Sequence, residues 1–119
     1  MKARRAAALF GFAAGALLVS GCKSHHVDMT LENRTGAVLE QMEIDYPSAS
    51  FGTNALAPGA ILHYRVQVRG AGAVIVQYSL AGGKTVHASG PELREGQDGE
   101  LRIVLEPGGQ VDFEPRIKP

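Results

Sequence analysis

Cys22, the only cysteine of this 119-residue chain, is the residue whose type and position most clearly predict chemistry. It follows three basic residues among positions 2–5, an apolar run over 6–19 and two small residues. A basic start, an apolar run and small residues in this order are typical of a secretory signal peptide. The apolar run is shorter than the roughly 20 residues that a transmembrane helix needs. The sequence therefore predicts that residues 1–21 direct export of the chain.

The segment Val19-Ser20-Gly21-Cys22 resembles the lipobox of bacterial lipoproteins. In that family the cysteine thiol receives a diacylglycerol, the chain is cut before the cysteine, and the new α-amino group is often acylated. The resemblance implies cleavage between Gly21 and Cys22 and a membrane anchor made of the lipid on Cys22. One acyl chain anchors a protein only marginally, but two or three on one residue make release slow. The alternative is a secreted protein whose cysteine has no such role.

Lys23, directly after the cysteine, bears on which membrane would hold the anchor. In Gram-negative lipoproteins an aspartate at this position favours retention in the inner membrane. Lysine resembles the outer-membrane class instead. The resemblance therefore implies a protein of the cell envelope, on the periplasmic side of the outer membrane if the cell is Gram-negative.

His25, His26 and Asp28 are the next residues with chemical potential. Imidazole and carboxylate groups are suitable ligands for a transition metal. Adjacent histidines at a flexible chain end rarely build a closed site, however, and residues 22–26 are predicted to form a short lipidated tether. We therefore expect no metal and no other cofactor.

A candidate binding face is formed by five polar residues: His63, Arg65, Arg69, Gln77 and His87. The strand registers predicted below align Arg65, Gln77 and His87 in a row across three strands. Two arginine side chains on one face could bind an anionic ligand through their guanidinium groups. The alternative, which we favour, is an ordinary solvated sheet face whose charges discourage edge aggregation.

The elements that would position these residues are β-strands, because apolar and polar residues alternate from Val27 onward. A second strand is predicted over about 38–46. Its apolar phase changes along the strand, so we expect a β-bulge near Glu40-Gln41. A short edge strand over 48–51 and a turn at 57–59 are predicted to follow.

The densest alternation, over residues 62–80, predicts a central hairpin. Its three-residue loop at 70–72 ends in Gly72, which can adopt the left-handed conformation that such a loop needs. This register pairs Val66 with Val76 and places both valines in the core.

The next loop has two possible lengths. A two-residue loop at Gly82-Gly83 would set polar Thr85 on the buried face, and an unpaired buried polar group costs about 1–3 kcal/mol. A three-residue loop at 81–83 pairs Tyr78 with Val86 instead, and we predict this longer loop.

The last third of the chain is predicted to contain a loop and one more hairpin. Residues 89–99 are rich in Gly, Pro and charge, which indicates a loop. Strands on either side of the turn at 107–109 would place Arg102 opposite Glu114 on the outer face. The end of the chain, from Pro115, is predicted to be a tail.

Together these elements predict an all-β fold: a small antiparallel β-sandwich of seven to eight strands, immunoglobulin-like in architecture. A small barrel is the alternative. The expected division is a signal peptide (1–21), a lipidated tether (22–26), a β-sandwich domain (27–115) and a C-terminal tail (116–119).

Composition limits the function more than it identifies it. The expected mature chain has 98 residues, with nine basic and twelve acidic residues, a formal charge of −3. A mildly acidic domain gives no electrostatic reason to expect nucleic acid. No nucleophile elbow surrounds any serine, so we do not expect an enzyme. We expect a monomeric, lipid-anchored interaction or scaffold module for an envelope protein partner; the alternative is a solute-binding lipoprotein that uses the basic face.

Overall fold

The computed structural model describes residues 24–118, which form eight strands and one short 3-10 turn at Pro107–Gly109. The strands are β1 (Val27–Asn33), β2 (Leu39–Tyr46), β3 (Ala49–Leu56), β4 (Ile61–Val66), β5 (Ala71–Ser79), β6 (Thr85–Arg94), β7 (Asp98–Leu105) and β8 (Val111–Lys118). Within these residues no helix is long and apolar enough to cross a membrane.

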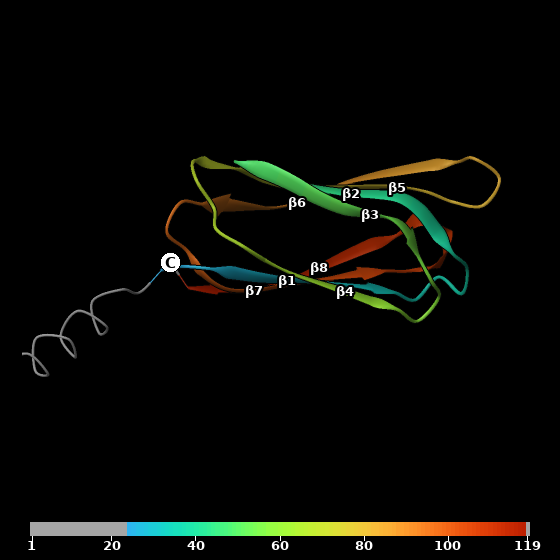
Figure 1. Cartoon of the computed structure of the whole chain (residues 1–119), viewed down its shortest axis with the longest axis horizontal. Helices are drawn as coiled ribbons and strands as arrows, with labels where there is room; N and C mark the ends of the chain where they lie inside the picture. Colours follow the sequence, from blue (N-terminus) through green and yellow to red (C-terminus); the bar gives the residue numbers. More distant parts are fainter. Residues whose placement is uncertain (1–23, 119) are drawn as a thin grey trace, which may run out of the picture.

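The strands make two four-stranded sheets that pack face to face (Figure 1). One sheet has the order β4-β1-β7-β8 and the other β3-β2-β5-β6. All neighbouring strands are antiparallel except β1 and β7, which run parallel. The predicted all-β sandwich of seven to eight strands is confirmed.

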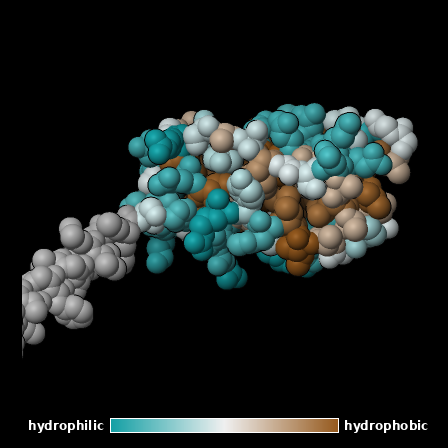
Figure 2. All heavy atoms as spheres, in the orientation of Figure 1, coloured by the Kyte–Doolittle hydropathy of each residue, from teal (hydrophilic) through white to brown (hydrophobic). Residues whose placement is uncertain are grey.

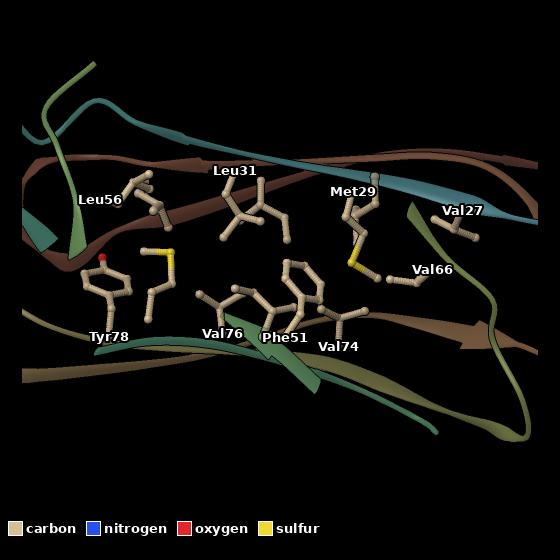
Figure 3. Close-up of a cluster of buried hydrophobic side chains, with 14 of the residues drawn as sticks. Val27, Met29, Leu31, Phe51, Leu56, Val66, Val74, Val76 and Tyr78 are labelled. Atoms are coloured by element: carbon tan, nitrogen blue, oxygen red, sulfur yellow. The ribbon is translucent and has the colours of Figure 1, made fainter. Parts of the chain in front are cut away.

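The core lies between the sheets and is built from the inward-facing half of each alternating strand. Val27, Met29 and Leu31 of β1 are fully buried and face Val76 and its neighbours from the opposite sheet (Figure 3). Burial of such aliphatic side chains contributes roughly 1.5–3 kcal/mol each. The alternation of apolar and polar residues therefore correctly predicts which residues of β1 are buried.

Three local predictions are confirmed in detail. The register between β2 and β5 shifts between Glu40 and Glu43, and Gln41 has a φ of 50° at this bulge. Tyr78 pairs with Val86 across β5 and β6, as the three-residue loop requires. Arg102 lies opposite Glu114 across β7 and β8.

The predicted central hairpin is wrong. β4 pairs with β1, and β5 pairs with β2 and β6, so Val66 lies opposite Val27 rather than Val76. Residues 67–70 carry the chain from one sheet to the other instead of closing a hairpin. The alternation correctly predicted that Val66 and Val76 are buried. It did not predict the neighbouring strand, because an inward apolar residue can pair with an inward residue of any strand.

The predicted loop over 89–99 and the predicted tail are also wrong. β6 continues to Arg94 and β7 begins at Asp98, so only a tight turn separates them. Pro91 is tolerated because β6 is an edge strand, where a missing N–H costs little. β8 continues to Lys118, which pairs with Asp98, so residues 116–118 belong to the sandwich.

Asn33, the last residue of β1, has a fully buried polar side chain. Its Nδ2 donates hydrogen bonds to the carbonyl oxygens of Ala37 at 2.8 Å, Leu56 at 3.0 Å and Ala57 at 3.1 Å. Its Oδ1 accepts from the backbone N–H and the hydroxyl of Thr35, at 3.0 and 2.6 Å. One amide thus joins the end of β1, the turn before β2 and the turn after β3.

Tyr78 is the second polar group in the core. Its ring is fully buried, and its hydroxyl finds no hydrogen-bond partner among the described residues. Figure 3 shows this hydroxyl pointing away from its own sheet into the apolar interior. Burial raises the pKa of Tyr78, because the apolar surroundings disfavour the charged phenolate.

Replacing Asn33 with alanine should destabilise the domain strongly. The change removes the side-chain donor of the buried Leu56 carbonyl and the acceptor of the Thr35 backbone N–H, and each unpaired buried group costs about 1–3 kcal/mol. We expect the free energy of unfolding to fall by at least about 2 kcal/mol in urea denaturation. Asn54→Ala on the exposed part of β3 is the control and should change it by at most about 0.5 kcal/mol. Equal effects of the two changes would contradict this role of Asn33.

Tyr78→Phe should have the opposite effect, because it removes an unpaired hydroxyl and keeps the ring. We expect the free energy of unfolding to stay the same or to rise by about 1 kcal/mol. The same urea denaturation measures it. A loss of more than about 1 kcal/mol would mean that the hydroxyl is paired in the folded protein.

Candidate functional site

The residues with the strongest sequence signal, Gly21 and Cys22, lie outside the described residues, so their predicted cleavage and lipidation stay predictions. The structure does describe the end of the tether. The His25 ring nitrogen bonds to the Asp98 carboxylate, and the His26 backbone N–H donates to the same carboxylate at 3.0 Å. These two contacts hold the pKa of Asp98 below its usual range. His25 and His26 are therefore held at the start of β7.

The same contacts bear on the metal that was considered for this segment. His25 is engaged with Asp98, whereas Asp28 accepts a hydrogen bond from Arg65 on the neighbouring strand. The described part of the chain contains no group of three or more His, Cys, Asp or Glu residues that could hold a metal ion.

The predicted basic face does not form, because its residues are divided between the two sheets. His63 and Arg65 lie on β4 beside Thr30 and Asp28 of β1. The Arg65 Nε donates to Asp28 at 2.9 Å, and this contact holds the pKa of Asp28 below its usual range. Arg65 is thus committed to a neighbour on its own sheet.

The other residues of the predicted face lie elsewhere. Gln77 and His87 are opposite one another on β5 and β6, as the predicted register of this pair required. Arg69 lies in the 67–70 crossover, and its backbone N–H donates to Ser48 Oγ at 3.2 Å. The predicted row of Arg65, Gln77 and His87 is therefore wrong. It failed because the chain passes from one sheet to the other at 67–70.

The outer face of the β4-β1-β7-β8 sheet largely neutralises its own charge. Arg102 donates to Glu32 at 2.7 Å and to Glu114 at 3.2 Å, and Arg34 donates to Glu32 at 2.8 Å. These hydrogen bonds hold the pKa of Glu32 below its usual range. The bond from Arg34 has the larger effect and the bond from Arg102 the smaller. Such a face offers little net charge to a ligand.

The side of the sandwich where β3 and β4 lie, called here the open side, has a different character. β3 and β4 are edge strands of different sheets and lie one above the other (Figure 1). The Phe51 ring of β3 stacks on the Tyr64 ring of β4 with centroids 4.3 Å apart and planes 11° apart. The Tyr46 ring of β2 lies with its centroid 6.3 Å from that of Phe51, tilted by 50°. The stacked pair of Phe51 and Tyr64, called here the aromatic bridge, therefore joins the two sheets.

Large apolar groups are exposed on the open side. Tyr64, on the inner face of β4, is 46% exposed, and Ile61, on its outer face opposite Glu32, is 59% exposed. Figure 2 shows hydrophobic residues gathered over β4 and between the two sheets on this side. Apolar surface concentrated beside free strand edges is a feature of protein interaction sites.

A pair of carboxylates lies on the outer face of β2, next to β3. Glu43 and Asp45 share this face because they are two residues apart on one strand. Asp45 raises the pKa of Glu43, through a side-chain hydrogen bond that favours the protonated form and through charge repulsion. Residues 41–43 and 50–54 line a hollow of about 610 Å³ beside this pair. The arrangement can attract a cationic group to the β3 edge.

The comparisons with known proteins define the fold and not the activity. The sequence matches no protein-family model and no curated protein. The fold is similar to that of a protein from Eubacterium rectale whose structure was solved by NMR, with a TM-score of 0.58. The match covers 76% of this chain and 88% of that chain at 12% sequence identity. At this identity the likeness shows a shared β-sandwich fold alone.

Sequence reasoning located the edge strand at 48–51 but missed its extension to Leu56 and its place beside β4. One signal was available, because residues 49–56 contain no charged residue and no proline. The alternation that puts Glu43 and Asp45 on one face was also visible. The stacking of Phe51 on Tyr64 was not, because it depends on which sheet each strand joins.

Proposed function

We propose that this protein is a non-catalytic interaction module of the cell envelope, anchored by a lipid on Cys22, that holds a protein partner along its open side. The observation that carries the proposal is the open side itself. Tyr64 of β4 is exposed there in its stack on Phe51 of β3, and both strands have one free edge, while Ile61 is exposed on the outer face of β4. Protein partners bind such surfaces by adding a strand or by covering apolar side chains.

The anchor is supported by the order of features around Cys22 and by the position of the domain relative to it. Only residues 23–26 separate Cys22 from Val27, where β1 begins. His25 and His26 are already bonded to Asp98. A lipid on Cys22 would therefore hold the sandwich close to the membrane surface.

The solute-binding alternative has lost its main support. It required Arg65 to join Gln77 and His87 on one face, and Arg65 instead pairs with Asp28 on the other sheet. The interior between the sheets is filled by buried side chains such as Leu31, Val76 and Leu101. A partner on the outside of the sandwich agrees better with both observations.

Cys22→Ser should abolish lipid attachment, because the chain has no other thiol to accept it. The measurement is metabolic labelling with a palmitate analogue, together with fractionation of membranes from soluble proteins. The wild-type chain should carry the label and sediment with membranes, whereas the serine variant should do neither. Lipid label on the serine variant would exclude Cys22 as the acceptor.

A photoreactive phenylalanine derivative at Ile61 should crosslink to one dominant partner in intact cells. Ile61 is exposed on the outer face of β4, an edge strand of the open side, so the probe tests this strand without disturbing the core. The same probe at His87, exposed on the opposite edge strand, is the matched control. Mass spectrometry identifies the adduct. Absence of an adduct from Ile61, or the same adduct from both positions, would refute the open side as the docking surface.

A further inference from the structure

Deepening the proposed function, on which this inference rests, we propose that the docking site is the free edge of β3. We further propose that its occupant is an extended segment of a partner protein with basic side chains at alternate positions and apolar ones between them. Four observations on the strand edges, the acidic pair and the aromatic bridge lead to this chemistry.

The first observation compares the four edge strands of the described sandwich. Free edges invite pairing with other chains, and proteins usually protect them with charged residues, proline or bulges. β4 carries Arg65, and β6 and β8 each carry a proline and several charged residues. β3, with the sequence ASFGTNAL, carries neither charge nor proline over eight residues. Only this edge is left open to an incoming strand.

The second observation concerns the outer side of β3. Gly52 lies opposite Glu43, and Ser50 lies opposite Asp45. Gly52 can carry no side chain, because a Cβ there would lie 2.0 Å from the Met42 carbonyl oxygen. A small and an absent side chain therefore leave both carboxylates accessible across β3.

The third observation is that the two carboxylates, Glu43 and Asp45, have no cationic partner among the described residues. In the region 24–118 neither Glu43 nor Asp45 forms an ion pair, whereas Asp28 and Glu32 on the other sheet both pair with arginine. A strand added to β3 would lie two strand spacings, about 10 Å, from β2. Lysine or arginine side chains opposite Gly52 and Ser50 could cross that distance and meet the carboxylates. The residues opposite Gly52 and Ser50 are two positions apart on the partner segment. The basic residues of the partner are therefore expected at every second position.

The fourth observation concerns the other face of the added strand. Side chains between the basic ones point toward the β4 side, where Phe51 and Tyr64 are stacked and Tyr64 is 46% exposed. Apolar or aromatic residues at these positions would extend this bridge and cover it. The site thus selects an amphipathic strand, basic on one face and apolar on the other.

A second copy of this chain fits the site less well. Its own β3 would present Ser50, Gly52 and Asn54 on the outer face, none of which is a cation. Pairing of two β3 strands would also add a second acidic pair to the same outer surface. Charge complementarity therefore favours a different protein as the partner.

The test uses the whole chain purified in a non-ionic detergent and two short fluorescent peptides. One has lysine at every second position with valine or tyrosine between, and the other has glutamate in place of lysine. Fluorescence anisotropy should show the lysine peptide binding at least about 10-fold more tightly at low salt. Added salt should narrow this difference, because it screens exposed charges.

Two pairs of variants locate the site. Ser50→Lys places a charge on the β3 edge and beside Asp45, and should weaken lysine-peptide binding at least about 10-fold. Ser89→Lys, the same change on exposed β6 at the other edge of the sheet, should leave binding unchanged. The double variant E43Q/D45N should bring the two peptides to within about 2-fold of each other. Glu92→Gln on β6 should keep their full difference. Circular dichroism confirms the fold of each variant.

The outcomes separate this inference from the proposed function. Equal binding of both peptides, equal effects of Ser50→Lys and Ser89→Lys, or a wild-type dimer that Ser50→Lys dissociates would each overturn the basic-strand assignment. None of these results depends on Cys22 or on crosslinking. If Ile61 crosslinks to a partner while the lysine peptide fails to bind, the interaction module stands and the β3 assignment falls.

Discussion

The arrangement of this sandwich depends on the hydrogen bonds of one buried amide, that of Asn33. It stands at the position of β1 where the alternation requires an inward residue, and an apolar side chain there could not satisfy the turns around it. Its contacts reach Thr35 and Ala37 in one connection and Leu56 and Ala57 in another. Since β1 belongs to one sheet and β3 to the other, the amide fixes how the two sheets meet at this end of the molecule.

The open side follows from that constraint. The chain leaves β3 at Leu56, turns within a few residues beside Asn33, and enters β4 in the opposite sheet at Ile61. A connection this short requires the two edge strands to lie over one another, and the stacked rings of Phe51 and Tyr64 fill the space between them. The aromatic surface is therefore a consequence of the fold's connection, and its partial exposure reflects the lack of any further strand at this side within residues 24–118.

Much of the fold was predictable from the sequence because its signals are local. The bulge at Glu40-Gln41 and the pairing of Tyr78 with Val86 follow from the alternation of neighbouring segments and the loop between them. The central hairpin failed because burial of Val66 specifies an inward face but not the strand beside it. The parallel neighbour β7 and the crossover at 67–70 are long-range choices that no short window contains. The same limit applies to the candidate site. Arg65 was predicted to be exposed, but its contact with Asp28 could not be predicted because the two residues are 37 positions apart in the sequence.

The tether and the open side are compatible in geometry. The described chain begins and ends at one end of the sandwich (Figure 1), and Asp98 holds His25 and His26 there. The strands run along the length of the molecule away from that end, so β3 presents its free edge at the flank and not at the end that carries His25 and His26. An anchor on Cys22 would therefore leave the edge accessible to an extended segment approaching along the membrane surface. Because strand addition uses backbone hydrogen bonds along the whole edge, a partner could bind without moving the domain away from its anchor.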